Sequence, residues 1–72
     1  MMAFVYADGE RHEGHSPRSI HLTLDGAQRA ACSQWERDLS EQWAQVANHP
    51  RAWRAEIGAC DEAWIIEMEV LP

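Results

Sequence analysis

The sequence predicts an α+β fold, a two-layer sandwich with one long amphipathic helix on a three- or four-stranded antiparallel sheet. Two observations carry this prediction. Short segments that alternate between apolar and polar residues flank a single central segment whose apolar residues recur at helical spacing. The order of these segments is β-β-α-β-β, which typically places the helix on one face of the sheet. The length of 72 residues allows one domain, residues 1–72.

Two strands are expected before the helix. Residues 2–7 alternate and predict a strand, and Asp8-Gly9 directly after them is typical of a turn. Residues 10–17 are polar, which favours a loop. Residues 19–24 alternate again, which predicts a half-buried strand.

A helix of about six turns is expected next, because apolar residues then recur every three or four positions. Thr23 or Asp25 can cap its start, since a side-chain oxygen there accepts from the free N–H groups of the first turn. Asn48 is a candidate C-terminal cap. His49-Pro50 ends the helix, because proline disfavours helical geometry in the residue before it. The apolar stripe consists of Leu24, Ala27, Ala31, Trp35, Leu39, Trp43 and Val46.

An antiparallel hairpin is expected after the helix. Residues 51–57 and 63–71 alternate, and residues 58–62 between them contain a glycine and favour a turn. In the last strand, we expect an apolar face that includes Trp64 to pack against the helix and a second, more polar face to lie away from it. We expect the sheet face away from the helix to carry Arg54, Glu56, Ile65, Glu67 and Glu69.

The charge is concentrated at the C-terminal end. The formal net charge is −6, and residues 55–72 contain five acidic residues and no basic one. Acidic residues two apart on a strand stand roughly 6–7 Å apart, so a row of them can imitate a phosphate backbone and occupy a basic protein surface. The alternative is a solvated face that only keeps the protein soluble. The candidate partner-binding residues are Glu56, Asp61, Glu62, Glu67 and Glu69.

Three histidines form the alternative site, a metal centre. His12 and His15 lie three apart, and His21 approaches them if the second strand folds back. Their spacing departs from the zincin motif, which needs two residues between the glutamate and the second histidine. Cys32 and Cys60 lack paired C-x-x-C spacing, so we expect reduced thiols. No cofactor is expected.

Catalytic motifs are not visible in the chain. It has no phosphate-binding glycine loop, no Ser-His-Asp order with context and no basic stripe for nucleic acid. We therefore expect a binding protein and not an enzyme. Residues 1–7 are apolar, but the segment is too short for a signal peptide or a membrane span. We expect a cytoplasmic protein that binds neither membrane nor nucleic acid directly.

In size, α+β order, acidic hairpin and lack of catalytic motifs, the chain resembles the small phage-encoded anti-CRISPR proteins. That class has no shared sequence pattern, so no functional residue is carried over by position. The resemblance implies a non-enzymatic inhibitor that occupies a basic, DNA-binding surface of a CRISPR–Cas complex, with a Cas subunit as partner in the host-cell cytoplasm. The alternative is a homo-oligomeric phage or toxin–antitoxin type module, a dimer that buries an apolar patch containing Trp64 or Ile65.

Overall fold

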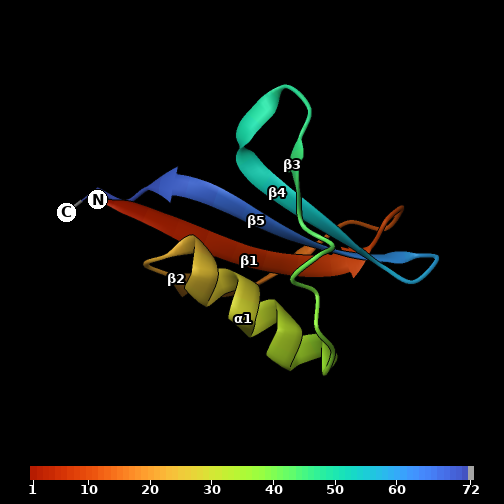
Figure 1. The fold of residues 1–72 in the computed structure, drawn as a ribbon. Helices are drawn as coiled ribbons and strands as arrows, with labels where there is room; N and C mark the ends of the chain where they lie inside the picture. The colour runs from red at the N-terminus through yellow and green to blue at the C-terminus, as the bar shows by residue number, and fades with distance from the viewer. Residues whose placement is uncertain (72) are drawn as a thin grey trace.

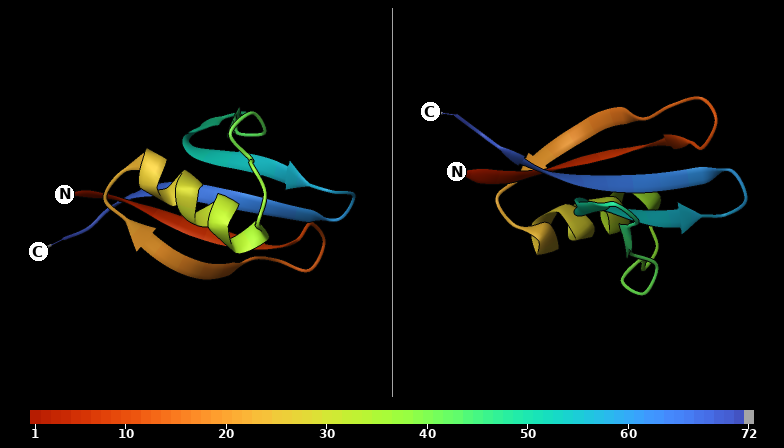
Figure 2. Two further views of the ribbon diagram at one scale, coloured as in Figure 1. Left: turned by 60° about the horizontal axis from the view of Figure 1, so that its bottom comes forward. Right: turned by 90° about the horizontal axis from the view of Figure 1, so that it is seen from above.

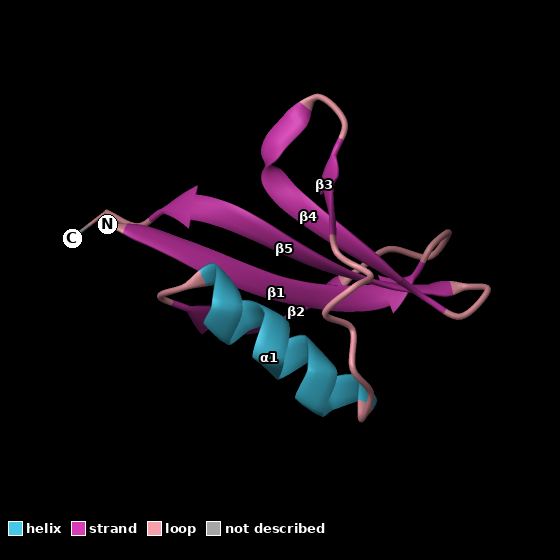
Figure 3. Ribbon diagram, viewed as in Figure 1, coloured by secondary structure: helices cyan, strands magenta, loops and turns pink. Residues whose placement is uncertain are grey.

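The computed structural model describes residues 1–71 and shows one helix on one face of a five-stranded antiparallel sheet (Figure 1, Figure 3). The strand order in the sheet is β2-β1-β5-β4-β3, so β5 is central and β2 and β3 form the two edges. Two further views show the helix across one face, with no helix on the opposite face (Figure 2). The elements are β1 (Met2–Glu10), β2 (Ser16–His21), α1 (Leu24–Trp35), β3 (Ala44–Val46), β4 (His49–Ile57) and β5 (Asp61–Glu69).

The expected α+β class is therefore confirmed, but the sheet has five strands rather than three or four. The additional strand is β3, which pairs with β4 across a tight turn. Asn48 adopts a left-handed conformation in that turn, with φ of 66°. Asparagine tolerates this conformation well and is therefore found both in tight turns and directly after helices. For this reason Asn48 resembled the end of a helix in the sequence. His49-Pro50 begins β4 instead of ending a helix.

The helix begins as predicted. Thr23 is the N-terminal cap, and its hydroxyl oxygen accepts a hydrogen bond from the backbone N–H of Gly26 at 2.9 Å. The buried side of α1 is narrow and consists of Ala27 and Ala31. These small side chains let the helix approach the sheet closely.

The helix ends at Trp35, so the expected helix was wrong over its second half. Glu36 takes a left-handed conformation with φ of 54°, which stops the helix. The chain then folds back, and Leu39 and Trp43 reach the core from a loop. Residues that pack into one core can thus keep helical spacing without being helical.

The first strand runs through the expected turn at Asp8-Gly9 and continues to Glu10. Asp8 is held in the strand by buried hydrogen bonds. Gly9 has no room for a side chain, because a Cβ there would lie 2.3 Å from the carbonyl oxygen of Gly14. The turn forms around Gly14, whose φ of 93° suits glycine.

The faces of β5 are the reverse of those expected. Tyr6 on β1 pairs with Ile65, and both belong to the core beneath the helix, where Ile65 is 0% exposed. Side chains alternate along a strand, so Trp64 and Ile66 point to the other face. The prediction failed because both faces of this strand are apolar, and a shift of one residue exchanges them.

Candidate functional site

The five acidic residues expected to bind a partner do not form one row. Glu56 and Glu62 are directly opposite each other in the β4–β5 pair and share the face away from the helix. Asp61, Glu67 and Glu69 are each an even number of residues from Ile65 along β5, so they share its helix-side face. The structure therefore divides the acidic hairpin between two faces of the sheet.

Arginines neutralise part of this acidic group. Glu67 accepts a hydrogen bond from Arg51 at 3.0 Å between Nε and Oε1. Arg11 lies between Glu56 and Glu62, with nitrogen–oxygen distances of 3.7 and 3.8 Å. A basic partner would thus meet carboxylates that already have a cation beside them.

The three histidines of the expected metal site are not brought together either. His15 bonds to Glu62 and lies beside the ring of Trp64 on the face away from the helix. His21 bonds to Ser19 on the helix side. His12 is exposed in the β1–β2 turn. Within residues 1–71, no group of three or more metal-ligating side chains is close enough to hold an ion.

A buried polar network ties the helix to the sheet on the covered face. Asp8 is 2% exposed, and it accepts hydrogen bonds from the hydroxyl of Tyr6, from Arg18 Nε at 2.7 Å and from Trp35 Nε1 at 3.2 Å. Burial, reinforced by the bond to Asp8, raises the pKa of Tyr6 above its ordinary value, so the phenol remains the donor. Three elements, β1, β2 and α1, meet at this one carboxylate.

A β-bulge directs Arg18 into this network. The pairing of β1 with β2 shifts register between Tyr6 and Ala7, which leaves Arg18 without a partner residue across the strand pair. Bulges commonly redirect a side chain in this way. The guanidinium group of Arg18 consequently reaches Asp8.

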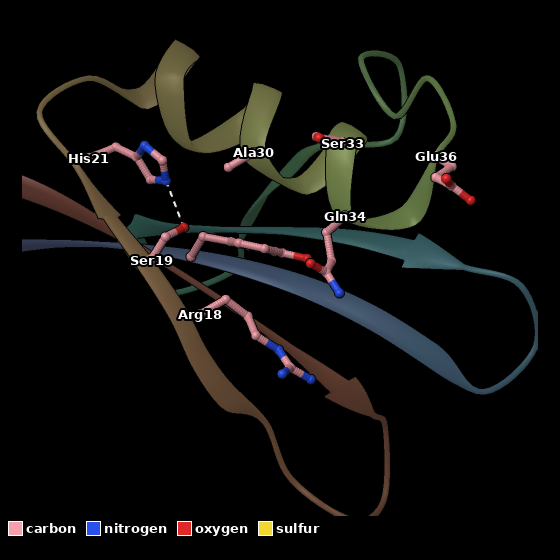
Figure 4. A pocket seen from close by; sticks show the side chains of 8 residues that line it. Arg18, Ser19, His21, Ala30, Ser33, Gln34 and Glu36 are labelled. Atoms are coloured by element: carbon pink, nitrogen blue, oxygen red, sulfur yellow. Dashed lines mark hydrogen bonds between the residues drawn. The ribbon is translucent and has the colours of Figure 1, made fainter.

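A pocket of about 410 Å³ opens beside the network, between β2 and α1 (Figure 4). Ser19 and His21 line it and share a hydrogen bond of 2.7 Å between hydroxyl and Nε2. A serine bonded to histidine is half of a nucleophilic triad, which also needs a group that orients the histidine. Among the described residues, the side-chain hydrogen bonds of His21 go to Ser19 alone, so no carboxylate orients it.

The face of the sheet away from the helix is apolar and uncovered by any described element. We call it the open face, defined by its apolar side chains from β1, β2 and β5. Ile20 is 70% exposed, Met68 50% and Ile66 41%. The strand pairs Val5–Ile66, Val5–Ile20 and Ala7–Trp64 place these side chains together. The open face consists of Val5, Ala7, Pro17, Ile20, Trp64, Ile66 and Met68.

A charged cluster borders one end of the open face, and a buried carboxylate is at its centre. Glu62 is 3% exposed. Its Oε1 accepts from His15 Nε2 at 2.9 Å and from Trp64 Nε1 at 3.0 Å. Desolvation opposes its ionisation, but these hydrogen bonds and the charge of Arg54 outweigh it and hold the pKa of Glu62 below its ordinary value. We call this the rim cluster: Arg11, His15, Arg54, Glu56 and Glu62.

The rim cluster holds Trp64 in a fixed position. Two side chains lie near its ring, with His15 at 5.7 Å between ring centroids and the Arg54 guanidinium carbon at 6.0 Å from the ring centre. Its indole N–H is bonded to Glu62. The apolar part of the ring therefore belongs to the open face without a free polar group.

Two shallow hollows lie on either side of Ile66. One, of about 400 Å³, is formed on the β1–β5 side by the open-face residues around Ala7 together with His15. The other, of about 250 Å³, is formed at the start of β4 around Pro50 and Ala52. Ile66 borders both. The centre of the open face is thus a ridge with a hollow on each flank.

Comparison with known protein families, curated proteins and solved structures found no match for this chain. None of the helices within residues 1–71 has the length and apolar character needed to cross a membrane.

The open face was missed by sequence reasoning, although a signal for it exists. Residues 63–66 form a continuous apolar run, and residues 2–7 are apolar on both sides of the strand. Continuous apolar strands are typical of sheets covered on both faces. The sequence provides one helix, which covers only one of them.

Proposed function

We propose that this chain is a non-enzymatic protein-binding module and that the open face is its binding surface. One observation carries the proposal: a central strand and its neighbours present large apolar side chains on a face that no described element covers. Contiguous exposed apolar surface of this kind, bordered by polar residues, is typical of interaction sites.

Trp64 supports the proposal because it already has the properties of an interface anchor. Tryptophan and arginine are enriched among the residues that dominate binding free energy. The contacts of Trp64 with His15, Arg54 and Glu62 fix its side chain before any partner arrives. Little conformational entropy is then lost when its ring is covered.

The shape of the surface favours a protein over a small molecule. The two hollows beside Ile66 are wide and shallow, and they accept protruding side chains rather than enclose a ligand. Their apolar lining suits aliphatic or aromatic side chains. The opposing charges of the rim cluster suit a polar interface border.

An inhibitor that occupies a basic surface of a CRISPR–Cas complex is the second candidate. The net charge of −6 and the five acidic residues after position 54 favour it. Its site is then the helix-side group of Asp61, Glu67 and Glu69. The inhibitor candidate depends on charge, whereas the open-face candidate depends on apolar contact. Substitutions that change one of these properties at a time therefore distinguish the two.

The test is a pull-down with three tagged forms: the wild-type chain, Ile66→Asp, and the double variant Glu67→Lys with Glu69→Lys. Each is first shown to be folded by circular dichroism, and each is used with bacterial lysates that contain or lack an active CRISPR system. Binding lost with Ile66→Asp and kept by the double variant supports the open face. Binding of a Cas subunit lost only with the double variant supports the acidic inhibitor. Binding that neither change affects contradicts both.

A further inference from the structure

Resting on the proposed function, we infer that the occupant of the open face is a second copy of this chain, packed sheet against sheet about a two-fold axis. The size of the face is the first argument. Strands about 4.8 Å apart, with β1, β4 and β5 each nine residues long and β2 six, give these four strands, the open face and the adjoining β4, a projected area on the order of 500 Å². Two such faces together cover about 1,000 Å², which is the lower limit expected of a specific protein interface.

The balance of charge on this face is the second argument. The rim cluster contains two arginines and two glutamates, and these are paired with one another. The chain as a whole carries −6. Two copies therefore repel each other through most orientations, whereas their open faces meet without net charge. A basic protein or a nucleic acid gains nothing from this neutral surface.

The relief of the face is the third argument. A two-fold interface places the same patch on both partners, so the patch must be complementary to itself. The open face has both required parts, a ridge at Ile66 and hollows on its two flanks. Alternation of small and large residues adds to this relief, because Ala7 and Ala52 lie low beside Trp64 and Ile66. The ridge of one copy fits a hollow of the other, and stacked sheets then lie about 10 Å apart.

Association would complete the core that one chain lacks. The buried set beneath the helix contains many alanines, with Tyr6, Leu39, Ile57 and Ile65 as its larger members. A chain of this length buries only about 60% of the surface that its unfolded form exposes. Covering the open face gives the sheet a second apolar layer.

Sedimentation equilibrium of the purified chain, from low to high micromolar concentration, tests the inference. We expect a mass near 16.4 kDa, twice the 8.2 kDa of the chain, at the higher concentrations. Ile66→Asp should weaken self-association at least about 100-fold, because it places an unpaired charge in a desolvated interface. Gln34→Asp makes the same change in charge at an exposed position of α1 and should leave the mass unchanged.

Two results overturn the inference: a wild-type chain that is monomeric throughout, and a dimer whose dissociation constant Ile66→Asp leaves unchanged. If Ile66→Asp does not fold, Ile20→Asp replaces it, since that side chain is far more exposed and lies on the same face. A third result separates the two proposals: the wild-type chain is monomeric, but in the pull-down it binds another protein that the Ile66→Asp variant does not bind. This result overturns the second copy as the occupant. It leaves the open face as the binding surface, so the two proposals fail separately.

Discussion

The two faces of the sheet each contain one buried carboxylate, and the two carboxylates are neighbours. Asp8 pairs with Ala63 on the helix-covered face, and at the next position Gly9 pairs with Glu62 on the open face. Each carboxylate accepts a tryptophan indole N–H and has arginine beside it. The same chemistry is therefore present on both sides of one strand pair.

The two networks differ in what they hold. Asp8 binds Trp35 from α1, so its network attaches the helix and closes that face. Glu62 binds Trp64 from its own strand, so its network fixes a ring on a face that stays open. One buried carboxylate thus serves the fold, and the other prepares a surface. The predictions below change each side in turn, from the largest expected effect to the smallest.

Neighbouring isoleucines on β5 give the largest contrast. Ile65→Asp places an unpaired charge beneath the helix at a cost of several kcal/mol, against a total stability of about 5–15 kcal/mol for a typical domain. We expect no cooperative thermal transition for this variant. Ile66→Asp should keep a cooperative transition at a lower midpoint, because Ile66 is already 41% exposed in the single chain and the new charge can reach water. Equal damage from the two changes, measured by circular dichroism, would show that the faces do not differ.

Asp8→Ala should be the next most damaging change. It leaves Tyr6, Arg18 and Trp35 without their common acceptor. A buried donor left without its partner costs about 1–3 kcal/mol, and Arg18 adds little because its side chain is half exposed. Urea unfolding measures the loss. Asp38→Ala is the control, because Asp38 is exposed and, among the described residues, its hydrogen bonds go to the neighbouring Ser40. Similar midpoints for the two variants would remove Asp8 from its role in attaching the helix.

Glu62→Gln should cost less and should change the dependence of stability on pH. The folded-state pKa of Glu62 lies below its ordinary value, so its carboxylate stabilises the fold above about pH 4.3 and this contribution is lost as the pH falls through the folded pKa. We expect the variant to be about 1–2 kcal/mol less stable near pH 7, with the difference disappearing in acid.

Glu56→Gln is the matched control for that measurement, since its side chain is largely exposed and its pair with Arg11 is long. It should follow the wild-type curve. A constant difference between Glu62→Gln and the wild type at every pH would contradict the assignment of the acid-sensitive group to Glu62.

The smallest effect is expected from Glu67→Lys combined with Glu69→Lys. These residues lie on the helix-side face, and the double change breaks only the exposed pair with Arg51, which is worth about 0–1 kcal/mol. Thermal stability and self-association should remain close to those of the wild type. Loss of the dimer in this variant would move the interface from the open face to the acidic residues.

Local signals in the sequence predicted part of the fold well. The Thr23 cap, the β4–β5 hairpin and the placement of a helix on one sheet face all follow from local patterns. The end of the helix could not be predicted, because Leu39 and Trp43 keep helical spacing while packing from a loop. The typical turn sequence Asp8-Gly9 is part of a strand instead, because the buried Asp8 is held there by hydrogen bonds to the distant Arg18 and Trp35.

The candidate site depended on the register of one strand. Residues 63–66 are apolar on both sides, so the pattern alone gave no reason to place Ile65 rather than Ile66 in the core. The pairing of the buried Tyr6 with Ile65 places Ile65 in the core and Ile66 on the open face. The acidic residues were visible in the sequence, but their arginine partners were not, because these pairs join different strands and turns.

Methyl NMR with a soluble paramagnetic compound tests the central claim most directly, because Ile65 and Ile66 report on opposite faces of one strand. Broadening of each methyl signal by the compound is measured in dilute and in concentrated protein. We predict that the Ile65 signal is protected at both concentrations, whereas the Ile66 signal is broadened in dilute protein and protected when concentrated. An Ile66 signal that is broadened equally at both concentrations would show that no second copy covers the open face.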